Sequence, residues 1–363
     1  MSLNINKNNI NSEIEKILNE AIDDGAFPGA TYAFITKDHV YSGVVGNREL
    51  FPKIIKNDIN TIYDMASLTK VVATTTSVMQ LLEDGKIRLF DPVEYYLPRF
   101  KYPKITLWHL LVHTSGLPEG IAGAKDELSE EDVWNKIYET EQRFTEGSKI
   151  MYSDINFILL GKIVELVSGE KLNDYVVNHI FKPLKMFDTS YLPKDKERCA
   201  ATELRNDKSY NGYVKGFVHD ETSFALGGVA GHAGLFSTAL DVSRFIKMIL
   251  NEGELDNERI LSKETVRMLY KTQIAEFDSI GNIPVRARKL GWQAHETYSN
   301  AGDYISDESI MHTGFTGTNI WIDKKRNLGF VLLTNRVHPT RNNTKHMRVR
   351  ARLANMILAN WSE

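Results

Sequence analysis

The chain has 363 residues, a length that permits one large domain or two interleaved domains. Its composition of 42% hydrophobic and 25% charged residues is close to the globular average, which excludes general disorder. The formal net charge is −3 and there is no long basic run, so nucleic acid is not an expected partner. A single cysteine, Cys199, excludes an intrachain disulfide.

The N-terminal segment lacks the apolar centre of a signal peptide, and no apolar run in the sequence reaches transmembrane length. We therefore expect a cytoplasmic protein with no membrane span, although a leader trimmed from the natural protein would leave the same sequence. Length and composition leave the oligomeric state open.

The predicted elements begin with a helix over residues 11–24, followed by two strands over residues 30–36 and 39–45. A long helix is predicted to start near Ser67. Further helices are expected over residues 105–112, 129–138, 155–167, 172–181, 239–250 and 262–270. Residues 318–322 and 328–333 are typical of a hairpin, and a last helix is expected over residues 344–359.

A helix and strands at the N-terminus thus mirror strands and a helix at the C-terminus, with mostly helical signals between them. This order predicts an α/β (α+β) fold in which both chain ends build one antiparallel sheet flanked by helices. Residues 1–75 and 206–363 are assigned to this sheet domain. Residues 76–205 are assigned to an inserted all-helical domain.

Ser67 and Lys70 lie three positions apart at the start of the predicted long helix, so they share one helical face. A serine hydroxyl is a poor nucleophile without an adjacent base, and a lysine in a partly apolar cleft can lose its charge and serve as that base. An isolated pair at this spacing is more simply a helix cap followed by a surface lysine. Two further segments change this balance.

Tyr152-Ser153-Asp154 precedes an apolar helix, and His312-Thr313-Gly314-Phe315 leads into the predicted hairpin. Together with Ser67-Leu68-Thr69-Lys70, these segments resemble, in order, the three motifs of the serine β-lactamase and penicillin-binding protein superfamily, in its class C and esterase-like branch. The resemblance covers nearly the whole chain and implies a β-lactamase/transpeptidase-like fold.

The resemblance implies a role for each motif. Ser67 would attack a carbonyl carbon and form an acyl-enzyme, and Lys70 and Tyr152 would be coupled candidates for the base. The backbone N–H groups of Ser67 and Phe315 would form the oxyanion hole, where loss of one donor typically costs about 2.7–4 kcal/mol of barrier. Thr313 and Gly314 would line the cleft, and the glycine would let a substrate approach the backbone closely.

Two positions depart from the family pattern: His312 replaces a lysine, and Asp154 replaces an asparagine. A histidine offers less fixed positive charge for a substrate carboxylate, and an aspartate removes an amide donor. Arg336 and Arg341 are therefore candidate carboxylate readers, with a solvated basic loop as the alternative. His232 lies between glycines and is either a pocket residue or a structural histidine.

These features predict a serine hydrolase that acts without metal or cofactor on a small-molecule or short-peptide substrate. The preferred substrate is an amide of D-alanyl or muropeptide type, or a β-lactam. One alternative is a small-ester esterase or transesterase on the same scaffold. The other is a sensor module that binds penicillins or muropeptides without hydrolysing them.

Overall fold

The computed structural model describes residues 9–124, 128–278 and 283–361. Its central feature is a sheet with the strand order β13-β14-β15-β1-β2-β3, in which all neighbours are antiparallel. These strands are β1 (Gly29–Ile35), β2 (Val40–Glu49), β3 (Ile55–Lys56), β13 (Ser309–Thr313), β14 (Asn319–Asp323) and β15 (Leu328–Thr334). The sheet confirms the predicted fold class.

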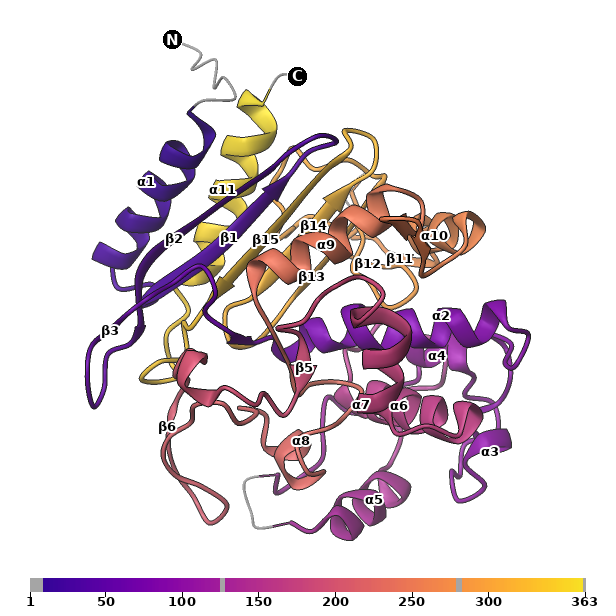
Figure 1. Ribbon diagram of the computed structural model, residues 1–363. Helices are drawn as coiled ribbons and strands as arrows, with labels where there is room; N and C mark the ends of the chain where they lie inside the picture. The colour runs from indigo at the N-terminus through magenta and orange to yellow at the C-terminus, as the bar shows by residue number, and fades with distance from the viewer. Residues whose placement is uncertain (1–8, 125–127, 279–282, 362–363) are drawn as a thin grey trace.

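The two chain ends meet at the middle of this sheet, where β1 pairs with β15 and Ala30 lies opposite Thr334. Helices α1 (Ile10–Asp23) and α11 (His346–Asn360) cover one face, and α9 (Ala239–Leu250) packs against β1 and β15 on the other (Figure 1). Both terminal helices follow their apolar stripes, because Ile14, Leu18, Leu353 and Ile357 are fully buried.

The helical part of the chain lies on the side of the molecule away from the two chain termini, at the bottom of the view in Figure 1. Its helices are α2 (Thr76–Glu83), α3 (Val93–Tyr96), α4 (Leu107–Leu111), α5 (Glu130–Glu139), α6 (Asp154–Ser168) and α7 (Leu172–Val176), which runs on into a π-helical turn, η3 (Val177–Phe181). The domain limits at residues 76 and 205 stay a prediction.

Short elements complete the chain and connect its two parts. They are the strands β4 (Tyr63–Asp64), β5 (Ser190–Tyr191), β6 (Leu204–Asn206), β7 (Asn211–Tyr213), β8 (Leu235–Ser237), β9 (Glu254–Leu255), β10 (Glu258–Arg259), β11 (Ile274–Glu276) and β12 (Arg286–Arg288), and the helices η4 (Lys196–Arg198), α8 (Glu221–Ala225) and α10 (Lys263–Tyr270). β4, β8 and β5 form a three-stranded sheet that leads the chain into the segment around Ser67.

The single long helix expected from Ser67 is instead three consecutive pieces. A 3₁₀ turn, η1 (Ala66–Leu68), is followed by a π-helical segment, η2 (Lys70–Thr75), before α2 begins. The hydroxyls of Thr75 and Thr76 donate to the carbonyls of Lys70 and Val71, five residues earlier, at 2.7 and 3.1 Å. These bonds are compatible with the wider π-helical turn and compete with regular helical pairing.

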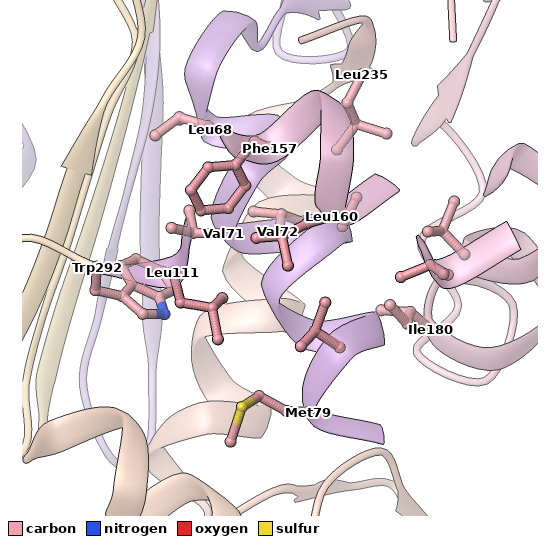
Figure 2. Packing of buried hydrophobic residues seen from close by; sticks show 14 of the residues in the cluster. Leu68, Val71, Val72, Met79, Leu111, Phe157, Leu160, Ile180, Leu235 and Trp292 are labelled. Carbon is pink, nitrogen blue, oxygen red and sulfur yellow. The ribbon is translucent and has the colours of Figure 1, made fainter. Parts of the chain in front are cut away.

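The main core joins the sheet to the helices around this segment. Leu68, Val71 and Val72 are fully buried and pack among Phe157 and Leu160 of α6 (Figure 2). The residues that flank the candidate nucleophile are therefore anchored by apolar packing on both parts of the molecule.

Candidate active site

The backbone before Ser67 is held in an unusual conformation. Ala66 has φ of 45°, a left-handed value that is uncommon for residues other than glycine. Its N–H donates to the buried carboxylate of Asp64 at 2.8 Å, and the N–H of Met65 donates to Leu235 O at 2.9 Å. These contacts fix the sharp turn that presents Ser67.

Ser67 Oγ lies between the two candidate bases from the sequence. Lys70 Nζ donates to it at 2.9 Å, and the phenol of Tyr152 donates to it at 2.8 Å. The Tyr152 ring stacks on His113 with ring centroids 4.5 Å apart, and Lys70 Nζ lies 5.0 Å from the Tyr152 centroid. The structure thus brings the first two sequence motifs together around one hydroxyl.

Lys70 is fully buried and has two further acceptors. Its Nζ donates to His232 O at 2.9 Å and lies 2.8 Å from Asp154 Oδ1. Burial on its own would lower the pKa of the Lys70 ammonium, but the nearby Asp154 carboxylate and Tyr152 outweigh it and raise the pKa. Burial also raises the pKa of Tyr152. Both groups are therefore protonated at neutral pH in the resting site.

His312 lies on β13 near Tyr152, and the centroids of these two rings are 6.2 Å apart. Burial and the charge of Lys70 lower its pKa to about 3, so the imidazole is neutral at physiological pH. Its Nδ1 lies 2.9 Å from the carbonyl of Thr313, which assigns the proton to that nitrogen. The fixed positive charge of the family lysine is absent at this position.

The turn after β13 is packed against the nucleophile segment. A Cβ on Gly314 would lie 2.6 Å from Met65 O and 2.0 Å from the hydroxyl of Thr318, so this position requires glycine. Thr316 and Thr318 donate to the carbonyls of Asp64 and Met65 at 2.7 and 3.0 Å. The space beside Gly314 is thus occupied by the protein's own backbone.

Arg336 and Arg341 lie close to the cleft but are engaged by the protein. Arg336 donates to Phe315 O at 2.7 Å and to the carbonyls of Arg341 and Asn343, each at 2.8 Å. Arg341 pairs with the carboxylates of Glu203 and Glu221. The half-exposed ring of Phe315 lies against both guanidinium groups, at 4.4 and 5.8 Å.

His232 is buried, and its Nε2 lies 2.8 Å from Asp220 Oδ1. With Asp154, these side chains form a group whose potential ligand atoms lie within 4.8 Å of one another, the one such metal-compatible group in the described ranges. The carboxylate of Asp154 contacts the Lys70 ammonium, and Asp220 also caps α8 by accepting from Ser223 N. The carboxylates that a metal ion would need as ligands are therefore already engaged by protein groups.

The sequence analysis missed Arg288, which lies on β12 beside Tyr152. A cavity of about 220 Å³ is lined by Arg288, Tyr152, His312 and Thr313, with His113, Gly291, Gln293 and Asn300. A neighbouring cavity of about 280 Å³ also contains Arg288 and Tyr152 in its wall. The one available signal was the alternation of Arg286-Ala287-Arg288, which is too short to indicate a site by itself.

The chain is similar to several known proteins over most of its length. Over 367 residues the chain is 30% identical to the N-acetylmuramyl-L-alanine amidase of Bacillus subtilis (strain 168), covering 90% of this chain and 81% of that protein. It is 32% identical over 323 residues to the putative D-alanyl-D-alanine carboxypeptidase of Escherichia coli (strain K12), covering 80% and 72%. The solved structure of EstCE1, a hydrolase with promiscuous acyltransferase activity, superposes with a TM-score of 0.78 at 19% identity and covers 97% of this chain and 99% of that chain.

The profile of the Beta-lactamase family matches residues 14–355. This range contains the Ser67, Tyr152 and His312 segments, and the predicted resemblance to the serine β-lactamase and penicillin-binding protein superfamily is confirmed. The chain belongs to the Beta-lactamase family and is a serine hydrolase of that type.

Proposed function

We propose that this protein cleaves an amide of D-alanyl or muropeptide type through an acyl-enzyme on Ser67. The observation that carries this proposal is the position of Ser67 Oγ, which is 2.9 Å from Lys70 Nζ and 2.8 Å from Tyr152 Oη. A hydroxyl held by two potential proton carriers is the arrangement that nucleophilic catalysis requires.

In the proposed reaction, the neutral form of Lys70 accepts the Ser67 proton while Oγ bonds to the substrate carbonyl carbon. The negative charge on the carbonyl oxygen is stabilised by the N–H groups of Ser67 and Phe315. As the carbon–nitrogen bond breaks, Tyr152 donates its proton to the leaving nitrogen and regains one from Lys70. Water then hydrolyses the acyl ester and returns Ser67 to its resting state.

The substrate class rests on the names of the relatives and on the charge of the cleft. One relative is named an N-acetylmuramyl-L-alanine amidase, and the other a putative D-alanyl-D-alanine carboxypeptidase. A D-alanyl peptide ends in a carboxylate, and Arg288 presents a cation to both cavities beside Tyr152. Arg288 is itself paired with Glu296 at 3.3 Å, but it lines both cavities and Arg336 and Arg341 line neither, so Arg288 is the better candidate reader of that carboxylate.

Replacement of Arg288 by methionine tests this assignment. We expect Arg288→Met to raise KM for a D-alanyl-D-alanine peptide about tenfold or more, because a charged hydrogen bond contributes about 1.5–3 kcal/mol. Turnover of an uncharged p-nitrophenyl ester should change little. Arg267→Met, at a half-exposed arginine paired with Glu264 on α10, is the matched control. An unchanged KM for the peptide in Arg288→Met would contradict the assignment.

A small-ester esterase is the second candidate function. The neutral state of His312 favours it, because the family's fixed charge for a substrate carboxylate is missing. EstCE1, a hydrolase with promiscuous acyltransferase activity, shares this fold. Rapid ester turnover without cleavage of D-alanyl peptides would select this alternative. A stable adduct that is never released would instead indicate a sensor module.

No helix in the described part of the chain is both long and apolar enough to cross a membrane. A cytoplasmic location and membership of the class C branch are further proposals. Cell fractionation with an antibody against the protein tests the location, and the rate of cephalosporin hydrolysis tests the branch.

A further inference from the structure

Two buried arginines donate hydrogen bonds to backbone carbonyls of the turn that carries Phe315. Arg350, on α11, is 5% exposed, and its Nη2 donates to Gly314 O at 3.2 Å and to Thr318 O at 2.9 Å. Arg336 donates to the carbonyl of Phe315. Consecutive peptide groups of this turn are therefore each held by a guanidinium group.

The contact of Arg350 falls on the peptide group that matters for the reaction. Gly314 C=O and Phe315 N–H belong to the same planar peptide, so fixing the carbonyl also fixes the direction of the N–H. Gly314 O accepts from Gly317 N at 3.1 Å as well. In the described part of the chain, no backbone carbonyl accepts a hydrogen bond from Phe315 N–H. That donor is therefore free for a substrate oxygen.

Arg350 is also unusual in its charge environment. The described residues include no carboxylate paired with it, and its hydrogen bonds go to backbone carbonyls alone. Burial and the nearby charge of Arg336 lower its pKa to about 9, which still leaves the guanidinium protonated at neutral pH. A buried cation without a counter-charge is costly for the fold. The cost is offset during the reaction if negative charge develops nearby.

We propose that Arg350 is a positioning residue for the oxyanion hole. It orients the Gly314–Phe315 peptide and polarises its carbonyl, which strengthens the Phe315 N–H as a donor to the developing oxyanion. This inference rests on the proposed acyl transfer to Ser67.

The turn has other attachments, so the role of Arg350 can be separated from general folding. The hydroxyls of Thr316 and Thr318 tie the turn to the backbone of Asp64 and Met65. Gly314 N donates to Thr318 O at 2.8 Å and closes the turn by itself. Loss of Arg350 should therefore leave the turn in place with a less well oriented peptide.

The test compares Arg350→Met, Arg350→Lys and Arg352→Gln. Arg352 lies on the same helix with a half-exposed side chain paired with Glu20, and it serves as the control. Single-turnover kinetics with a p-nitrophenyl ester give the acylation rate constant and the ester affinity separately. We expect Arg350→Met to lower the rate constant about tenfold, a smaller loss than the roughly hundredfold or greater loss caused by removing a whole oxyanion donor.

The affinity of Arg350→Met for the ester should stay within about twofold, because the peptide acts on the transition state. Arg350→Lys keeps the charge and should regain part of the lost rate, while Arg352→Gln should match the wild type. If Arg350→Met does not fold, Arg350→Gln takes its place with the same expectations.

A wild-type rate in Arg350→Met would overturn the inference. So would equal losses of rate and affinity with no recovery in Arg350→Lys, which indicate a structural role. If the wild-type protein itself forms no acyl group on Ser67, the proposed function fails first. If the wild type is acylated and Arg350→Met is acylated at the same rate, the inference about Arg350 is wrong while the proposed function stands.

Discussion

Lys70 shows most clearly how one residue's surroundings determine what it can do. Three acceptors surround its Nζ: the Ser67 hydroxyl, the Asp154 carboxylate and the His232 carbonyl. A lysine surrounded by these three acceptors, one of them a carboxylate, is held as an ammonium, whereas a general base must be neutral. The residue at position 154 therefore controls how much of Lys70 is available as a base.

Asp154→Asn removes the carboxylate that raises the pKa of Lys70. With a raised pKa, the neutral amine is scarce at pH 7 and kcat/KM should increase with pH. In Asp154→Asn the Lys70 pKa falls, so the rising limb should move to lower pH and the rate at pH 7 should increase. A pH profile of ester hydrolysis measures this, and an unmoved limb would argue against Lys70 as the base.

His312 is expected to have no part in the pH dependence near neutrality, since its pKa is lowered to about 3. His312→Lys places a fixed charge in the cavity lined by Arg288. It should improve the KM for carboxylate-bearing peptides relative to the uncharged ester, as steady-state kinetics with both substrates would show. Equal KM values for the peptide in wild type and variant would indicate that Arg288 already does this work, or that no carboxylate binds here.

The sequence was informative where chemistry is encoded in short motifs. Ser67, Lys70 and Tyr152 were predicted from short motifs that resemble those of a known family, and the structure places Lys70 Nζ and Tyr152 Oη within hydrogen-bond distance of Ser67 Oγ. The partners of Arg341 could not be predicted in this way, because Glu203 and Glu221 lie far from it in the chain. Arg288 was missed because its strand has three residues and belongs to a two-stranded sheet with β11.

At the scale of elements, the site depends on a close approach between α6 and the segment before His232. A Cβ on Gly231 would lie 2.1 Å from Phe157 O, and Gly161 Cα is 2.9 Å away. The Thr74 hydroxyl holds Gly231 O at 2.6 Å. This packing places the His232 carbonyl against Lys70, and glycine is needed for it.

Gly231→Ala should therefore both destabilise the fold and reduce activity. Overpacking of this kind costs about 1–3 kcal/mol, and displacement of the His232 carbonyl removes one acceptor from Lys70. Denaturant unfolding and ester turnover measure the two effects. Gly120→Ala is the control, because a Cβ there meets no atom within 4 Å. Equal stability of the two variants would contradict this reading of the packing.

The segment from Ser67 to Glu83 marks a limit of sequence-based prediction. Its apolar spacing predicted one helix, and the helix exists from Thr76 onward. The start differs because Thr75 and Thr76 bond their side chains to carbonyls five residues back. Periodicity reports which face is buried, but it does not report this competition between side chain and backbone.

At the scale of the whole molecule, both chain ends cooperate in one sheet. The prediction of this arrangement came from matching elements at the two termini, and the pairing of β1 with β15 confirms it. The sheet edge bears His312 on β13, while the helical part supplies Tyr152 just before α6. The site therefore requires the N-terminal, helical and C-terminal parts to be folded together.

Leu353→Ala tests the contribution of the terminal helix to this unit. Leu353 is a fully buried residue of α11, and removal of its side chain should lower the free energy of unfolding by about 2–5 kcal/mol. Met347→Ala on the same helix, where the side chain is 56% exposed, should change it little. Chemical denaturation measures both, and a small effect in Leu353→Ala would mean that α11 contributes little to the fold.

The central claim is that Ser67 carries the acyl group, and intact-protein mass spectrometry over time tests it most directly. Wild-type protein and Ser67→Ala are each incubated with a D-alanyl-D-alanine peptide, a fluorescent penicillin and a p-nitrophenyl ester. We expect a mass increase equal to the acyl group in the wild type, located on Ser67 by peptide mapping, together with release of D-alanine. Ser67→Ala should fold normally, carry no adduct and show no turnover. Wild-type rates in Ser67→Ala on every substrate would contradict the account.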